Sequence, residues 1–164
     1  MKKVLLLLAV VASGYVNAQA FKGKGDVKFQ IGANLQDNAS GITASADFGL
    51  GENLSYGFSA TYLLGVNGIV GDDVEFIDRA DIKARINANL GNVVNISEKF
   101  DVYPGLDLGL RNFGAHLGAR YFFTNGFGVY TEAGIPIAKY DKDVRGYDHL
   151  NNQFVFQVGA SFNL

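Results

Sequence analysis

Cysteine is absent from the 164-residue chain, and proline and long apolar runs are scarce. Without cysteine the protein can form neither a disulfide nor a lipid-bearing cysteine anchor. The 2 prolines stand against 21 glycines. This balance favours strands and tight turns over helices, because glycine costs a helix about 1 kcal/mol per site. The apolar run of residues 4–12 has nine residues, far below the roughly 20 that a membrane-spanning helix needs.

The amino-terminal residues have the order of a secretory signal peptide. Lys2 and Lys3 precede the apolar run, and the small-residue ending "VNA" finishes at Ala18. This order predicts export with removal of residues 1–18, so that residues 19–164 form the mature chain as one domain. Removing the two lysines from 14 basic residues leaves 12 against 16 acidic residues, a formal charge of −4. This balance argues against a nucleic-acid partner.

In eight segments of the mature chain, apolar side chains alternate with polar or small ones along the sequence. In residues 80–90, alanine, isoleucine and leucine alternate with aspartate, lysine, arginine and asparagine. A period of two predicts strands, whose successive side chains point to opposite faces. The segments are 25–35, 42–50, 54–64, 80–90, 101–110, 115–123, 127–138 and 153–164. Their length matches the roughly 9 to 11 residues of a tilted strand that crosses a bilayer.

The apolar face of these segments carries no charge, whereas the opposite face carries ten. The ten are Asp26, Lys28, Asp47, Asp81, Lys83, Arg85, Asp101, Asp107, Arg120 and Glu132. A lysine or arginine facing lipid at the bilayer midplane costs about 2 to 4 kcal/mol. We therefore expect hydrocarbon outside and the charges inside. A secreted lipocalin-like carrier, with the apolar face inside, is the soluble alternative.

Glycines and aromatic residues favour the membrane arrangement. Nine glycines lie on the polar face, where a narrow eight-stranded interior needs small residues beside large ones; they are Gly32, Gly49, Gly57, Gly105, Gly109, Gly118, Gly128, Gly134 and Gly159. Aromatic residues of the apolar face gather near one rim, as an interfacial girdle requires. The predicted girdle comprises Phe48, Tyr56, Tyr121, Phe123, Phe127 and Phe162.

The connections alternate between two ends of the predicted barrel. If the first strand rises from the periplasm, the lower connections are 51–53, 91–99 and 124–126. The upper connections are then 36–40, 66–78, 111–114 and 139–152. The last strand must pair with the first, because an open edge in hydrocarbon would leave backbone groups unsatisfied.

The final segment, "QFVFQVGASFNL", ends on the outward residues Phe162 and Leu164. This ending resembles the carboxy-terminal assembly signal of outer-membrane barrels. The mature chain resembles the small eight-stranded barrels of Gram-negative bacteria, the group of the OmpA transmembrane domain and OmpX. The stretch "LGARYFFTNGFGVYTEAG", residues 117–134, is similar to a hairpin of porin-family barrels common in Bacteroidota.

The resemblance implies an all-β fold, an eight-stranded antiparallel up-and-down transmembrane β-barrel preceded by a signal peptide. It implies the cell outer membrane as location, outer-membrane lipids as surroundings and the barrel-assembly machinery as a partner during insertion. In OmpA-like barrels an interior cluster of Arg, Lys and Glu is implicated in opening, and Lys83, Arg85, Arg120 and Glu132 offer the same residue types.

Charges inside a narrow barrel should pair, because an isolated charge in a low-dielectric interior is costly. We expect a lumen charge network of Asp47, Asp81, Lys83, Arg85, Asp107, Arg120 and Glu132. Such a network is compatible with a static polar core and with a gated or leaky pore.

Catalysis and metal binding have little support in the sequence. His116 faces the predicted lumen and His149 follows Asp148 in the last upper connection, so that no region offers enough ligands for a metal. An Asp and His pair could serve hydrolysis or acyl transfer, but the connections 66–78 and 139–152 contain no serine. We expect no catalytic role, no metal and no cofactor.

The sequence thus predicts a non-catalytic integral outer-membrane protein with a polar lumen filled by side chains. Its role would be structural or would consist of binding through the upper loops, with another envelope protein as a partner in a larger complex. A narrow porin-like channel for small solutes is the main alternative. An outer-membrane enzyme and a secreted carrier are less favoured alternatives than this channel.

Overall fold

The computed structural model describes residues 19–67, 74–140 and 147–164. The expected signal peptide, residues 1–18, lies outside the described residues, as do the segments 68–73 and 141–146 of the two long upper connections. In the described part of the chain, no helix has the length and apolar character needed to cross a membrane.

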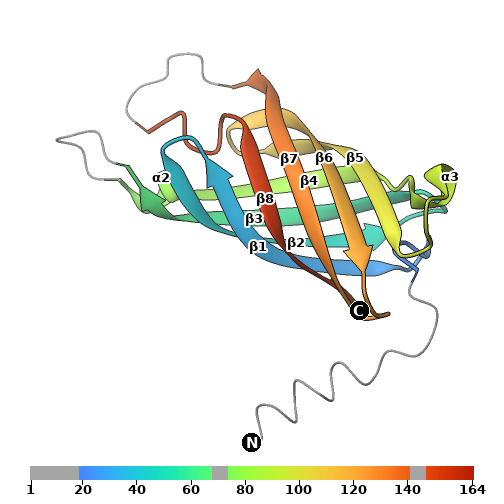
Figure 1. Ribbon diagram of the computed structural model, residues 1–164. Coiled ribbons are helices and arrows are strands. Elements are labelled where there is room, and N and C mark those ends of the chain that lie inside the picture. Colours follow the sequence, from blue (N-terminus) through green and yellow to red (C-terminus); the bar gives the residue numbers. More distant parts are fainter. Residues whose placement is uncertain (1–18, 68–73, 141–146) are drawn as a thin grey trace, which may run out of the picture.

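Eight antiparallel strands close into a barrel in which each strand pairs with its neighbours in sequence (Figure 1). β1 also pairs with β8, from Lys28 opposite Asn163 to Gln36 opposite Val155. The strands are β1 (Val27–Gln36), β2 (Ala39–Gly49), β3 (Leu54–Val66), β4 (Ala80–Ala88), β5 (Phe100–Gly109), β6 (Asn112–Phe122), β7 (Phe127–Lys139) and β8 (Val155–Asn163). The predicted number, order and closure of the strands are confirmed.

Two upper connections are tighter than the sequence suggested. β1 and β2 are joined by residues 37–38 and β5 and β6 by residues 110–111, because flanking residues continue the ladder, as in the pair Gln36 and Ala39. Asn38 has a φ of 58°, a left-handed conformation that asparagine tolerates better than most residues. On its other side β2 pairs with β3, and that ladder shifts register between Ser40 and Gly41.

Two one-turn helices lie at opposite ends of the barrel (Figure 1). α2 (Phe76–Arg79) precedes β4, and a reciprocal capping box between Glu75 and Asp78 holds its first turn. α3 (Gly91–Val94) follows β4, and Asn95, whose φ is 49°, caps its carboxyl end. We call the end that carries α2 the upper end and the end that carries α3 the lower end. Helices of four residues are too short to show an apolar period, so the sequence indicated connections at both places.

The barrel is apolar outside and polar inside. Ile82, Leu108 and Leu117 each expose more than half of their surface on the outer wall. Nine of the ten charged residues assigned to the inner face are buried, and Lys83 is the partly exposed one. The predicted assignment of the two faces is confirmed.

Candidate functional site

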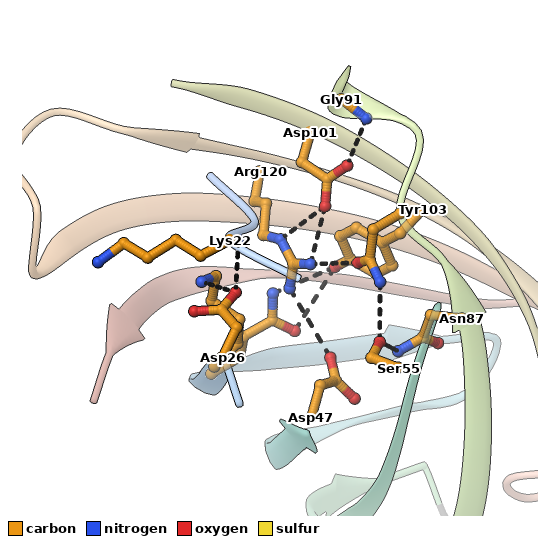
Figure 2. A network of polar contacts seen from close by, with 12 residues as sticks. Lys22, Asp26, Asp47, Ser55, Asn87, Gly91, Asp101, Tyr103 and Arg120 are labelled. Atoms are coloured by element: carbon orange, nitrogen blue, oxygen red, sulfur yellow. Dashed lines mark hydrogen bonds and ion pairs between the residues drawn. The ribbon is translucent and has the colours of Figure 1, made fainter. Parts of the chain in front are cut away.

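Arg120 of β6 is the centre of the charged cluster at the lower level of the lumen. Its Nη2 and Nε donate to Oδ2 of Asp101 over 2.8 and 3.1 Å. The other oxygen of Asp101 accepts a hydrogen bond from the backbone N–H of Gly91 over 2.8 Å. On its other side Arg120 faces Asp47, with 3.8 Å between Nη1 and Oδ2 (Figure 2). Two carboxylates therefore share this guanidinium at a place where all three side chains are buried.

Tyr103 of β5 fills the centre of the lumen beside two arginines. The guanidinium carbon lies 4.6 Å from the ring centroid in Arg120 and 6.0 Å in Arg85, distances that suit cation–π attraction. The Tyr103 hydroxyl accepts a hydrogen bond from Nε2 of Gln30 over 3.2 Å. Gly118 lies directly opposite Tyr103 in the ladder, and a Cβ at Gly118 would overlap the ring. The expectation that inward glycines make room for large side chains is met at this pair.

Arg85 of β4 organises the middle level. Its Nη2 donates to Oε2 of Glu132 over 2.6 Å and lies 2.7 Å from Nε2 of His116. Nδ1 of His116 lies 2.9 Å from Oδ2 of Asp107. Nε2 of His116 also lies 2.8 Å from Oδ1 of Asn87. The imidazole thus stands between Arg85 and a second carboxylate, that of Asp107. Nε of Arg85 lies 3.6 Å from Oδ1 of Asp47, which joins the middle level to the lower one.

The upper level is less tightly paired. Nζ of Lys83 lies 3.6 Å from Oδ2 of Asp81, and the Lys83 side chain remains 23% exposed. A cavity of about 20 Å³ lies here, with Asp81, Lys83 and Glu132 among its lining residues. This volume suits one water molecule and no larger solute.

A segment before β1 covers the lower end of the lumen. Ala20 and Phe21 are buried, and the Ala20 N–H donates to the Glu98 carbonyl over 2.7 Å. The Phe21 ring centroid lies 5.9 Å from Nζ of Lys28 and 6.0 Å from the guanidinium carbon of Arg120. Lys28 also forms an ion pair with Asp26. The alternating pattern does not predict this cover, because Phe21 stands outside every alternating segment.

The segment before β8 covers the upper end. Tyr147 and Leu150 pack with Leu63 in an apolar cluster of buried residues. Nδ2 of Asn112 donates to the backbone carbonyl of Asn151 over 3.0 Å. Leu63 is an apolar residue on the inward, mostly polar face of its strand. Its contacts with Tyr147 and Leu150 account for an apolar side chain at this position.

Five of the seven residues of the predicted charge network belong to one linked cluster, in which His116 connects Asp107 to Arg85; the five are Asp47, Arg85, Asp107, Arg120 and Glu132. Lys83 and Asp81 form a separate pair. Two members were not assigned to the network from sequence, His116 and Asp101, although both were placed on the polar face. Within the described residues, no group of three or more carboxylate, histidine or cysteine side chains is arranged to hold a metal.

Aromatic rings of the predicted girdle contact one another along the lower rim. The centroid separations are 5.4 Å for Phe48 and Tyr56, 5.4 Å for Tyr121 and Phe123, 6.3 Å for Phe123 and Phe127, and 5.7 Å for Phe127 and Phe162. Phe29, which the sequence analysis left out, joins Phe162 at 6.4 Å. Leu164 is 81% exposed beside this rim. The girdle and the assembly signal of Phe162 and Leu164 stay predictions.

Comparisons with known proteins give a family and a fold. A family model described as "Family of unknown function (DUF6646)" matches residues 11–164. No curated protein matches the chain. A solved structure from the de novo design of transmembrane beta-barrels matches with a TM-score of 0.50 at 12% identity, over 87% of this chain and 98% of the designed one. The solution structure of Outer Membrane Protein G from Pseudomonas aeruginosa matches with a TM-score of 0.46 at 11% identity, over 88% of this chain and 99% of the other.

Proposed function

The chain belongs to the family of unknown function DUF6646, and we propose that it is an integral outer-membrane protein of a Gram-negative bacterium with a closed, non-catalytic barrel. A relationship to porin-family and OmpA-like barrels of Bacteroidota is part of this proposal. The observation that carries it is the split between an apolar outer wall and nine buried charged residues inside. Both the exposed apolar wall and the buried charges are favourable only if hydrocarbon surrounds the barrel.

The contents of the lumen favour a closed barrel over a porin-like channel. Tyr103 and Asp101 have no exposed surface, and Arg120 is 1% exposed, so these side chains block the centre. The segments around Phe21 and Leu150 cover the two ends. A solute would have to break several buried ion pairs to pass, which is costly in a low-dielectric interior. We therefore propose a structural role or binding through the upper loops, as a subunit of an envelope complex.

Bromine quenching of a single tryptophan tests which face of the barrel meets lipid. The chain has no tryptophan, so an introduced one is the only indole. In vesicles of brominated phosphatidylcholine, we expect strong quenching for Leu108→Trp, whose side chain is 60% exposed on the outer wall. Tyr130→Trp, on the inner face, should be quenched several-fold less. Equal quenching of the two, or the reverse order, would exclude the membrane arrangement and favour the soluble carrier.

Conductance in planar bilayers tests whether the barrel is closed. We expect the wild-type protein to give no steady openings, because buried and paired side chains fill the lower and middle levels of the lumen. The Leu108→Trp variant, recorded in the same way, should be equally silent, and its indole should be quenched in vesicles of brominated lipid, so that silence cannot be ascribed to failed insertion. Steady openings of the wild-type protein would support the porin-like channel in place of our proposal.

A further inference from the structure

The outer wall carries an apolar groove of about 390 Å³ across β1 to β4. Ala44, Ala60 and Ala80 form its floor, and Ala44 lies directly opposite Ala60 in the ladder. Ile42 and Tyr62 are among its taller walls. Small residues surrounded by bulky ones leave a hollow that a neighbouring side chain does not fill. Its volume lies within the range of about 300 to 1,000 Å³ that is usual for ligand sites.

α2 forms a fixed ledge at the upper end of this groove. The Phe76 ring lines the groove and lies 5.3 Å from the Tyr62 ring, measured between centroids. The capping box of Glu75 and Asp78 holds the helical turn. Nη2 of Arg111 donates to the Ile77 carbonyl over 2.8 Å, which ties the ledge to the connection between β5 and β6. Four-residue helices are unstable alone, so these contacts keep Phe76 in place.

A positive charge stands beside the ledge. Arg79 ends α2 and directly precedes the groove residue Ala80, and its Nη1 donates to the carbonyls of Leu63 and Leu64 over 3.3 and 3.1 Å. Carbonyls do not neutralise a guanidinium. Among the described residues no carboxylate forms an ion pair with Arg79, whereas Arg111 has Asp78 at 3.5 Å. Arg79 does not line the groove itself, but it lies in sequence between the lining residues Phe76 and Ala80, so that a cation stands next to the upper end of the groove.

An apolar groove next to a cation suits a lipid that carries both an acyl chain and a phosphate. We infer that the groove holds one acyl chain of a lipid A-type phosphorylated glycolipid, with a phosphate at Arg79. Arginine recognises phosphate through charge-assisted hydrogen bonds, and basic positions beside membrane segments bind lipid head groups. The choice of glycolipid rests on the proposed function, because in that orientation the upper end lies in the outer leaflet, where such glycolipids are found.

A second outer groove provides the matched control. It has a volume of about 260 Å³ over β4 to β6, with Ala84, Leu106 and Phe113 among its lining residues. The arginine that borders it, Arg85, turns its guanidinium into the lumen toward Glu132. We therefore expect no specific phosphorylated lipid in this second groove.

Native mass spectrometry of the detergent-solubilised protein with added lipid A tests the inference. We expect Ala60→Phe, which fills the floor, to weaken lipid A binding at least about tenfold, and Arg79→Gln to weaken it by about the same factor through loss of the phosphate contact. Ala84→Phe should bind like the wild-type protein. All variants should keep the faster gel migration of the unheated, folded barrel, which excludes misfolding as the cause.

Two results would overturn the assignment. One is equal lipid A binding by the wild-type protein, Ala60→Phe and Arg79→Gln. The other is binding of phosphatidylglycerol as tight as that of lipid A, which would exclude the glycolipid as the specific occupant. Either result can occur in a barrel that inserts into the bilayer and gives no conductance. Failure of the lipid A inference is therefore distinguishable from failure of the proposed function.

Discussion

Replacing Arg120 with methionine is expected to lower the free energy of unfolding by about 3–5 kcal/mol, the usual cost of removing one partner of a buried ion pair. Asp101 would keep one backbone N–H, from Gly91. Asp47, whose oxygens accept no hydrogen bond from any described residue, would keep only Arg85 at 3.6 Å. Methionine retains much of the arginine volume, so the loss reports the uncompensated carboxylates. Urea unfolding of the protein refolded into lipid vesicles measures it.

The double variant Arg120→Met with Asp101→Asn separates charge from packing. We expect it to recover a large part of the loss, because an amide in place of Asp101 removes the buried negative charge. Lys24→Met, which removes an exposed lysine at the same end of the barrel, should change the unfolding free energy by less than about 0.5 kcal/mol. Our account of the network fails if Arg120→Met costs no more than Lys24→Met, or if the double variant is as unstable as Arg120→Met alone.

The face on which each side chain lies could be predicted from sequence with few errors. In β4, Ile82 and Ile86 are exposed on the wall while Asp81 and Arg85 are buried in the lumen, as the alternation indicates. This prediction needs only the period of two along one strand. It does not depend on which strand lies next to which, nor on the register between them.

The partners inside the lumen could not be predicted, because they depend on register. A turn at residues 111–114, as the sequence suggested, would pair residue 110 with residue 115 and place Arg120 opposite Gly105. The turn at residues 110–111 instead places Arg120 opposite Asp101. The shift from residue 105 to residue 101 is even, so every face stays correct while every partner changes. Asp101 was missed as the partner of Arg120 for this reason.

Segments outside the alternating pattern were also beyond sequence analysis. Phe21 is a single aromatic residue in a glycine- and lysine-rich stretch, and its burial depends on a cavity formed by all eight strands together. Phe76 of α2 lies in a four-residue helix that is too short for any periodic signal. Features of this kind come from tertiary packing, in which residues far apart in sequence create the surface that a short segment covers.

Replacing Gly118 with alanine is expected to destabilise the barrel by roughly 2–3 kcal/mol, the upper part of the range for overpacking a filled interior. The new Cβ would overlap the Tyr103 ring, which lies opposite in the ladder. The ring has little freedom to withdraw, because Gln30 donates to its hydroxyl and Arg120 lies 4.6 Å from its centroid. Vesicle-based urea unfolding gives the size of the loss, and less of the protein should reach the faster-migrating folded form.

Gly134 supplies the matched substitution, since it also faces the lumen but has room. A Cβ at Gly134 would meet its nearest atoms, in Ala115 and His116, at 3.8 and 3.9 Å, which is ordinary contact. Gly134→Ala should therefore be neutral or stabilise the fold by about 0.4–1 kcal/mol, because alanine restricts the unfolded chain. Equal destabilisation by the two substitutions would mean that any inward glycine is required for backbone reasons. A loss confined to Gly118→Ala would assign that glycine the specific task of admitting the Tyr103 ring that blocks the lumen.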